Sequence, residues 1–462
     1  MNCLTKETLI SKVSDALFEN RGVIFIGSGI SAPSTQVNWF DLLKPLAEDL
    51  KIELDDEHDD LPLIAQYIVN ECTGNRGYLL NEISKVFNKN FPLNSYHKAL
   101  STTKVSSIWT TNYDLLLERA FSEFLIDVKV NDDAISRNFT NSDIEILKIH
   151  GCISRSHHNE IVITQEDYED FLDNKPATSQ RLCNDLLKKS FLFIGYSYRD
   201  PNIRNIMTTA RRLAKKATQE HYLITLKPKH TNKRILKQKQ RRLELWCKDL
   251  KRLGISTLVI ENKDELEEIL STISQKSRGN TIYVTGSHEK GSSVAQNLGI
   301  SLAKNKKITL VSGQSSGIGS DAVSAFTEQC IKDRYDINTR IQIFPNPYAA
   351  NANFSNDPSL LPDLKKCRSK LMNSTQIVIA FSGGMGTEAE IEVAKNRNCK
   401  MLPVVLNDSD LDNNAIKKIL DDPTMSGYLK QTDTVYYEKL LQGTVSVEDI
   451  MGCVNKMLGW EV

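Results

Sequence analysis

The chain has 462 residues, of which 40% are hydrophobic and 25% are charged, the composition of a folded protein with two or three domains. Its 58 Lys and Arg residues balance its 58 Asp and Glu residues. The protein as a whole therefore lacks the net positive charge that would attract nucleic acid or anionic membranes. The nine cysteines are widely spaced and form no C-x-x-C pair, which argues against a disulfide framework or a four-cysteine zinc site.

The N-terminal residues lack the apolar core of a signal peptide, and no apolar run approaches the ~18 residues that span a bilayer. We therefore expect a soluble cytoplasmic protein without a membrane partner.

Short apolar runs alternate with longer amphipathic stretches in the first part of the chain. Apolar runs without polar alternation suit parallel strands buried on both faces, and the stretches between them suit crossover helices. The predicted strands are 23–26, 108–111, 146–149, 161–164, 191–194, 222–226 and 257–260, and a closing helix is predicted at 263–275.

Residues 277–280 (SRGN) are typical of a linker, and the alternation of strands and helices then restarts. The second set of predicted strands is 282–285, 308–312, 341–344, 377–381 and 402–406. We predict two α/β domains, residues 1–276 and 281–462, rather than one very large sheet.

Two stretches have biased charge. Residues 53–60 hold six acids in eight positions, which favours a solvated loop or helix start over a metal or partner site. Residues 211–252 carry fifteen Lys and Arg against three acids, with apolar residues at helical spacing in the second half. Because no stacking aromatics are interleaved, an amphipathic helix facing solvent or a neighbouring subunit is favoured over a nucleic-acid surface.

A glycine turn follows the first predicted strand. The segment reads Gly27, Ser28, Gly29, Ile30, Ser31 and Ala32. Glycine lets the backbone approach a pyrophosphate closely, and the N-terminus of a following helix supplies N–H donors and a positive dipole. The segment is not a full G-x-G-x-x-G, so a tight structural turn accounts for it equally well on its own.

Polar residues also lie at the ends of three later strands. They are Thr111, Asn112 and Asp114, then His150, then Gly195 and Ser197. Because ligands of open α/β sheets bind at the carboxyl ends of the strands, these residues could converge with the glycine turn on one crevice. A lone His after an apolar strand is more often structural, whereas a His at the same sheet edge as a glycine turn and an Asn is a better candidate base.

These four segments, GSGIS, TNYD, HG and GYSYRDPNI, resemble the NAD-binding domain of sirtuins in order and spacing over about residues 15–260. The resemblance implies a Rossmann-type domain in which Asn112 holds the ribose and nicotinamide region or orients a water. It implies that His150 contacts the ribose hydroxyls and acts as base, and that Asp114 tethers Asn112 or a hydroxyl. The implied NAD⁺ contacts are Gly27, Ser28, Gly29, Ser31, Ala32, Thr111, Asp114, Gly195 and Ser197.

Two departures from the sirtuin pattern bear on the reaction. The cysteines of the sirtuin zinc ribbon are missing, and Asn38, Trp39 and Phe40 stand where sirtuins have the Arg of their cofactor loop. Without the zinc module there is little of an acyl-lysine cleft. The remaining chemistry is cleavage of the nicotinamide–ribose bond, through an oxocarbenium-like state. We therefore expect NAD⁺ as substrate, hydrolysis to nicotinamide and ADP-ribose, and no metal.

The second domain carries Gly/Ser turns at three predicted strand ends. The first holds Gly286 and Ser287, the second spans 313–319, and the third spans 383–386. Successive backbone N–H groups in such turns can form a nest for phosphates. One glycine turn would be uninformative, but three in these topological places favour nucleotide binding over tight packing alone.

This pattern resembles the lysine-decarboxylase-like LOG superfamily, whose signature is Pro-Gly-Gly-x-Gly-Thr-x-x-Glu. Ser382 replaces the Pro, and Arg368 lies in a segment that matches the active-site Arg segment of that family. The acids are shifted. The family has Glu residues two and three positions after its Thr, whereas here Glu388 directly follows Thr387 and Glu390 lies three residues after it. The shift favours a pocket that binds a nucleotide without cutting it, and leaves open which glutamate contacts the ligand.

A sirtuin-like domain followed by a SLOG domain of this LOG-like type is similar to the NAD⁺ hydrolase family of the Thoeris anti-phage defence system over nearly the whole chain. The resemblance implies that a TIR-domain partner makes a cyclic ADP-ribose isomer on infection. The isomer would bind the SLOG domain and switch on NAD⁺ destruction, giving abortive infection. The implied activator contacts are Gly286, Ser287, Ser316, Phe344, Arg368, Gly384 and Glu388. A homotetramer or filament is also implied, since a bistable interface could amplify the response.

Two alternatives remain open. The C-terminal domain could itself be a nucleotide phosphoribohydrolase, which would release free base from AMP-like nucleotides without His150. The chain could instead be a non-catalytic nucleic-acid-binding protein that uses residues 211–252, with steeply salt-dependent binding and no NAD⁺ loss. The second alternative leaves both sets of glycine turns without a role.

Overall fold

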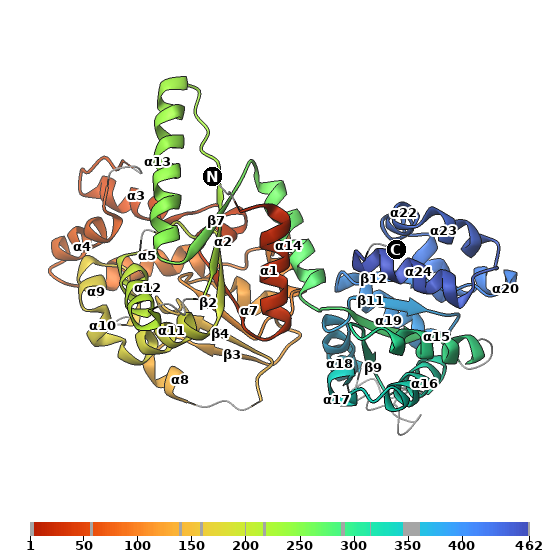
Figure 1. The fold of residues 1–462 in the computed structure, drawn as a ribbon. Coiled ribbons are helices and arrows are strands. Elements are labelled where there is room, and N and C mark those ends of the chain that lie inside the picture. The colour runs from red at the N-terminus through yellow and green to blue at the C-terminus, as the bar shows by residue number, and fades with distance from the viewer. Residues whose placement is uncertain are drawn as a thin grey trace. The chain divides into compact units, whose positions relative to one another are not determined.

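The computed structural model describes residues 4–55, 59–137, 141–157, 160–198, 200–215, 219–287, 292–314, 316–344 and 361–460. The chain forms two compact α/β units, each with its own parallel sheet (Figure 1). One unit comprises residues 1–101 and 105–273, and the other comprises residues 102–104 and 274–462. The predicted fold class is confirmed. No helix in the described ranges is both long enough and apolar enough to cross a membrane.

The first unit is built on a seven-stranded sheet in the order β3-β4-β2-β1-β5-β6-β7, with parallel pairing throughout. The strands are β1 (Gly22–Ile26), β2 (Ser107–Thr110), β3 (Ile126–Lys129), β4 (Ile144–Lys148), β5 (Ser190–Ile194), β6 (His221–Leu226) and β7 (Ile255–Ile260). The chain passes from β1 to strands on one side and returns at β5 on the other. A ligand is therefore expected at the carboxyl ends of β1 and its neighbours, where the strand order reverses.

Helices pack on both faces of this sheet. Alternate residues of β1 enter opposite core clusters, with Ile24 and Ile26 in one and Val23 and Phe25 in the other. The helices are α1 (Lys6–Phe18), α2 (Ser28–Thr35), α3 (Trp39–Asp49), α4 (Leu61–Glu71), α5 (Gly77–Phe87), α6 (Ser95–Ser101), α7 (Leu116–Ala120), α8 (Asp132–Ser136), α9 (Gln165–Glu169), α10 (Phe171–Asn174), α11 (Pro176–Lys188), α12 (Pro201–Ala214), α13 (Lys233–Arg252) and α14 (Lys263–Lys276). Helices α1, α6, α7 and α14 contribute to the first cluster, and α11, α12 and α13 to the second.

The predicted strand at 161–164 is wrong. Val162 donates its N–H to the His150 carbonyl over 3.1 Å and accepts the Tyr113 hydroxyl at 2.6 Å. Ile163 bonds the Asp167 carboxylate, which belongs to the first turn of α9. The segment is a buried connection whose backbone groups bond to a side chain and to neighbouring loops rather than to a strand.

The sequence prediction also missed β3, at the edge of the sheet. Its sequence IDVK alternates apolar and charged residues, and only the final Lys129 is buried. The search for continuous apolar runs selects central strands, so an alternating edge strand escapes it.

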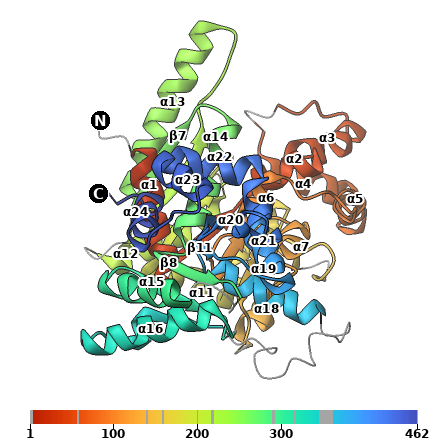
Figure 2. The ribbon, with the colours of Figure 1, turned by 90° about the vertical axis from the view of Figure 1, so that its right-hand side faces the viewer.

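The basic stretch at 211–252 includes the end of α12, strand β6 and the whole of α13. Leu250 of α13 is buried and Trp246 packs against the second core cluster, whereas Leu245 is 50% exposed. The N-terminal half of the helix extends away from its sheet (Figures 1 and 2). The predicted amphipathic helix is therefore present.

His221, the first residue of β6, makes the stability of the first unit depend on pH. Burial lowers the pKa of His221 to about 4, and its Nδ1 accepts the Phe191 N–H at 3.2 Å. Between pH 6.5 and 4 the unfolded chain binds a proton that the folded chain excludes, so stability falls as the pH falls. The expected loss is about 3 kcal/mol across that interval.

Urea unfolding followed by tryptophan fluorescence would measure this loss, since three of the four tryptophans lie in the first unit. In His221→Asn the steepness of the loss between pH 6.5 and 4 should decrease. An unchanged pH dependence in the variant would contradict this assignment.

The second unit has a five-stranded parallel sheet in the order β10-β9-β8-β11-β12. Its strands are β8 (Thr281–Thr285), β9 (Thr309–Ser312), β10 (Ile341–Ile343), β11 (Ile377–Ala380) and β12 (Lys400–Pro403). Its helices are α15 (Ser292–Lys304), α16 (Ile318–Lys332), α17 (Ile337–Arg340), α18 (Leu361–Asn373), α19 (Met385–Asn396), α20 (Asp408–Leu411), α21 (Asn414–Leu420), α22 (Pro423–Thr432), α23 (Thr434–Leu441) and α24 (Val447–Leu458). The strand order reverses at β8, which places the expected ligand site at the ends of β8 and β11.

The predicted linker at 277–280 is not an exposed connection, because Ser277 and Arg278 are fully buried in the second unit. The Arg278 guanidinium donates to the carbonyls of Thr375 at 2.9 Å and Thr102 at 2.8 Å, and also to the carbonyl of Arg397. Its Nη1 lies 3.2 Å from the Cys399 sulfur. A buried cation requires such partners, so this short segment is part of the core.

Candidate functional site

A cavity of about 920 Å³ lies at the carboxyl ends of β1, β2, β4 and β5 in the first unit. A volume of this size is ordinary for a small-molecule site. Of the residues predicted to act there, those lining it are Ser28, Gly29, Ser31, Thr111, Asn112, Asp114, His150, Gly195 and Ser197. Gly27 and Ala32 are not among the lining residues. The topology therefore brings segments from across the first 200 residues to one place.

The glycines of the first turn allow a close approach between two loops. A Cβ on Gly27 would lie 2.4 Å from the Gly195 carbonyl oxygen, and one on Gly195 would lie 2.6 Å from the Ile30 nitrogen. Gly195 also has a φ of +60°, in the region that favours glycine. The Gly29 N–H donates to the Gly195 carbonyl at 2.9 Å, so this amide is used within the chain. The glycines thus hold the start of α2 against the loop after β5, at the cavity edge.

The side chain of Asn112 is held in place by the hydrogen bonds of its amide nitrogen. Its Nδ2 donates to the Ser31 hydroxyl at 3.0 Å and to the Gly27 carbonyl at 3.3 Å. Its backbone N–H donates to the Thr110 hydroxyl at 3.0 Å. The buried carbonyl oxygen Oδ1 has no hydrogen-bond partner among the described residues. Since buried polar atoms are rarely left unpaired, this acceptor is suited to a ligand or water in the cavity.

Asp114 was expected to tether Asn112 or a ribose hydroxyl, and its tether to a hydroxyl stays a prediction. Its Oδ1 accepts the N–H of Leu116 at 2.9 Å, at the start of α7. The ammonium of buried Lys148 bonds to the Asp114 carbonyl and lies 3.0 Å from the Glu118 carboxylate. Although burial disfavours the charged ammonium, Glu118 raises the pKa of Lys148. Asp114 lines the cavity while its loop is held by a buried ion pair.

His150 follows β4 and is 5% exposed. Its Nε2 lies 2.8 Å from Oδ2 of Asp200, and the edge of its ring meets Tyr168 at a centroid distance of 5.5 Å. The contact with Asp200 has the distance of an ion pair, but the ring N–H and the carboxylate oxygen are not aligned as a hydrogen bond. Imidazole and carboxylate thus form a buried pair at the cavity wall.

Asp200 was not among the predicted site residues. Its Oδ1 caps α12 by accepting the N–H groups of Asn202 at 2.8 Å and Ile203 at 3.2 Å. The loop before it holds Tyr198 at a φ of +56°, a strained conformation for a bulky residue. An Asp before a Pro is an ordinary helix-cap signal, so the sequence indicated the capping of α12 but not the contact with His150.

Another wall of the cavity comes from the segment that differs from sirtuins. Asn38 begins α3 with a capping box, and Trp39 and Phe40 line the cavity beside it. The Trp39 and Tyr168 rings lie 6.3 Å apart. Of the acidic run, residues 56–58 lie outside the described chain, and Asp59 and Asp60 line the cavity. This wall therefore offers aromatic surface and two acids instead of the Arg of sirtuins.

The predicted activator residues either follow strands of the second sheet or belong to helices α18 and α19. Gly286 follows β8, where a Cβ would lie 2.7 Å from the Phe381 Cβ, and the Ser287 N–H donates to the Ser382 carbonyl at 3.0 Å. Ser316 follows β9, Phe344 follows β10, Gly384 caps α19, Glu388 lies in its first turn, and Arg368 lies on α18. Residues 345–360 of the long loop lie outside the described chain.

Two of the three glutamates of α19, Glu388 and Glu390, occupy different environments. Glu388 lies 3.4 Å from the Lys418 ammonium. Glu390 is half-buried and accepts the Thr285 hydroxyl at 2.5 Å, at the end of β8. Burial raises the pKa of Glu390, while Thr285 and the nearby Arg368 partly oppose the shift. Glu390, three residues after Thr387 like the last Glu of the LOG signature, is thus bonded to a strand end, and Glu388 as the activator contact stays a prediction.

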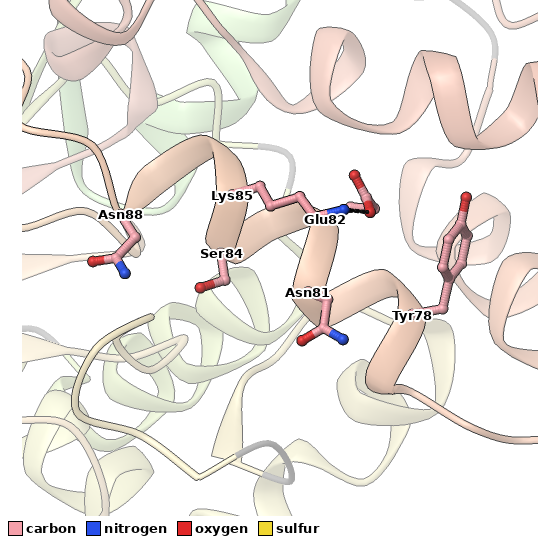
Figure 3. A pocket seen from close by; sticks show the side chains of 6 residues that line it. All are labelled: Tyr78, Asn81, Glu82, Ser84, Lys85 and Asn88. Carbon is pink, nitrogen blue, oxygen red and sulfur yellow. Dashed lines mark hydrogen bonds and ion pairs between the residues drawn. The ribbon is translucent and has the colours of Figure 1, made fainter.

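A second hollow, of about 620 Å³, lies along α5 (Figure 3). All its lining residues come from this one helix and its C-terminal cap, and Lys85 pairs with Glu82 at 2.6 Å. Because no strand end or second loop contributes to it, we place no ligand there. Across the described parts of both units, no group of three or more His, Cys, Asp or Glu side chains is arranged to hold a metal ion.

Comparisons with known proteins match both halves of the chain. A family model described as a SIR2-like domain matches residues 106–246, and one described as the Sir2- and TIR-associating SLOG family matches residues 265–460. NAD(+) hydrolase ThsA of Bacillus cereus (strain MSX-D12) is 28% identical over 422 residues, covering 86% of each chain. The protein of the same name from Enterococcus faecium is 30% identical over 347 residues, covering 71% of this chain and 72% of the relative.

A more distant match covers about half of the chain. Defense-associated sirtuin 2 of Bacillus subtilis is 24% identical over 229 residues, which are 47% of this chain and 22% of that protein.

Proposed function

Because this chain belongs to the family of the NAD(+) hydrolase ThsA proteins, we propose that it cleaves NAD⁺ in the cavity of the first unit, giving nicotinamide and ADP-ribose. The observation that carries the proposal is that two groups line one cavity: Asn112, whose buried carbonyl oxygen has no hydrogen-bond partner among the described residues, and His150, whose Nε2 lies 2.8 Å from the Asp200 carboxylate. NAD⁺ is therefore the substrate, and no metal is invoked.

In the proposed reaction the C1′–N bond breaks and nicotinamide leaves neutral with the bonding electron pair. The ribose passes through an oxocarbenium-like state, and a water oxygen then bonds to C1′. Asn112 would hold the nicotinamide side of the ribose or orient that water through Oδ1. His150 would contact the ribose hydroxyls and take the proton of the water before releasing it to solvent, a contribution of typically ~10²–10⁴-fold.

The remaining implied NAD⁺ contacts divide by position. Ser28, Gly29, Ser31, Thr111, Asp114, Gly195 and Ser197 line the cavity and are proposed to contact NAD⁺ directly. Gly27 and Ala32 would act through the packing of α2.

Products would test this proposal directly. Chromatography of NAD⁺ incubated with the purified full chain and cyclic ADP-ribose isomers should show nicotinamide and ADP-ribose in equal amounts. Release of nicotinamide with a cyclic product only would contradict hydrolysis. Loss of NAD⁺ without nicotinamide would contradict cleavage at the glycosidic bond.

We further propose that a cyclic ADP-ribose isomer, made by a TIR-domain partner, binds the second unit and activates the hydrolase, so that NAD⁺ is depleted during phage infection. The description of the matching family, Sir2- and TIR-associating, supports a TIR partner. The strand-end turns and Arg368 support a nucleotide ligand, since a guanidinium binds phosphate bidentately. A change from about 1% to 99% active requires ~10⁴-fold preference for the active state, which a homo-oligomer could help to amplify.

Arg368→Ala should raise the concentration of cyclic ADP-ribose isomer needed for half-maximal activation by about 10²-fold, because a charge-assisted phosphate contact is lost. Activity titrations measure this shift. Lys366→Ala is the matched control, since Lys366 lies on the same helix with its ammonium 3.8 Å from Asp363 at the surface, and it should respond like the parent protein. Equal responses of both variants would contradict the placement of the activator beside Arg368.

A further inference from the structure

The buried pair of His150 and Asp200 carries an inference that rests on the proposed function and deepens it. Both side chains are 6% exposed, and His150 Nε2 lies 2.8 Å from Asp200 Oδ2. The Nε2 atom is buried, whereas His150 also lines the cavity. The ring is thus turned with Nε2 against the carboxylate, which leaves Nδ1 as the nitrogen able to serve a ligand.

The two oxygens of Asp200 have separate tasks. Oδ1 is fixed by the first N–H groups of α12, those of Asn202 and Ile203. Oδ2 is buried and has no neighbour aligned as a hydrogen-bond donor among the described residues. A carboxylate clamped by a helix start on one oxygen has little freedom to turn, so its other oxygen is held toward the imidazole.

We propose that Asp200 is the positioning residue of His150: it holds the proton of the neutral imidazole on Nε2 and so presents the Nδ1 lone pair to the substrate. A carboxylate accepts hydrogen bonds and donates none, so facing Nε2 it favours the tautomer that carries the proton there. The misaligned N–H does not weigh against this assignment, since such contacts often align only when substrate binds. Tyr198, two residues before Asp200, has a strained φ of +56°, and such strain is common at functional sites.

The variant Asp200→Asn tests the proposal. Asn caps a helix as well as Asp does, so α12 should be preserved, but its amide can donate to Nε2 and shift the imidazole proton to Nδ1. The kcat for activator-stimulated nicotinamide release should fall by about 10²–10⁴-fold. The KM for NAD⁺ should change little, because Asp200 acts through His150 rather than on the substrate.

Asp422→Asn is the matched control. Asp422 also precedes a proline and caps its helix, α22, through the N–H groups of Thr424 and Met425. Its other oxygen pairs with Lys395 instead of a histidine. This variant should keep the parental kcat, and both variants should keep the parental Tm within a few degrees.

The ¹⁵N chemical shifts of His150 give a readout that does not need turnover. They should report a proton on Nε2 in the parent protein and on Nδ1 in Asp200→Asn. An unchanged kcat, a loss confined to KM, or the same tautomer in both proteins would overturn the proposal. Failure of the proposed function is distinguishable, because the parent protein would then release no nicotinamide while the tautomer measurement still decides the role of Asp200.

Discussion

Asn112→Ala should lower nicotinamide release by about 10³-fold at saturating activator. The substitution removes Oδ1, which we assign to the reacting region of NAD⁺, and removes the Nδ2 bonds to Ser31 and Gly27. Loss of one preorganised polar group at a reacting centre costs about 10²–10³-fold, and loosening the α2 turn adds to it. The Gly27 carbonyl also accepts the Ile30 N–H at 3.2 Å, so the loss of stability should stay near 1 kcal/mol.

Asn94→Ala is the control for the structural part of that effect. The Nδ2 of Asn94 donates to the Ile30 carbonyl at 2.8 Å and the Ser34 hydroxyl at 3.0 Å, which are the same kinds of contact with the same helix. Asn94 is not among the cavity residues, so its variant should retain turnover within a few fold. Parental turnover in Asn112→Ala, or an equal loss in both variants, would contradict a chemical role for Asn112.

Arg278→Ala should destabilise the second unit by about 3–5 kcal/mol. The substitution leaves a cavity in the core and three buried carbonyls, those of Thr375, Thr102 and Arg397, without the guanidinium. Arg278→Lys should recover only part of the loss, because an ammonium cannot reproduce the planar fork of donors. Differential scanning calorimetry of the full chain would measure the shift in the transition of the second unit.

Lys332→Ala provides the surface comparison for Arg278. Its side chain is 62% exposed and pairs with Glu328 at 2.7 Å within α16, so its loss should change stability by no more than about 0.5 kcal/mol. An Arg278→Ala protein as stable as Lys332→Ala would show that residues 277–280 behave as a linker.

The sequence predicted the two sheets well because their central strands are buried on both faces. Strands such as β1 and β11 are continuous apolar runs bounded by turn-forming residues, a pattern that is typical of parallel strands covered by helices. The same criterion failed at 161–164, where the apolar run is buried as a connection. The prediction of a linker around Arg278 failed as well. The neighbouring residues are typical of turns, and the burial of Arg278 comes from tertiary packing, which the local sequence does not show.

The candidate site was predictable to the extent that topology determines it. Parallel strands bring their carboxyl ends to one edge, so Asn112 and His150 could be expected together before any distance was known. The orientation of the side chains at the site was not predictable from topology. The 2.8 Å contact between His150 and Asp200 is a matter of side-chain orientation, whereas the sequence shows Asp200 only as a helix cap before Pro201.

The central claim is an NAD⁺ hydrolase in the first unit that a nucleotide bound to the second unit activates. Its most direct test is the rate of NAD⁺ loss by the purified full chain, with and without each cyclic ADP-ribose isomer. We expect little loss without an isomer and a rate at least about 10²-fold higher with one of them. The same rate with and without every isomer would contradict activation, and no NAD⁺ loss under any condition would contradict the hydrolase itself.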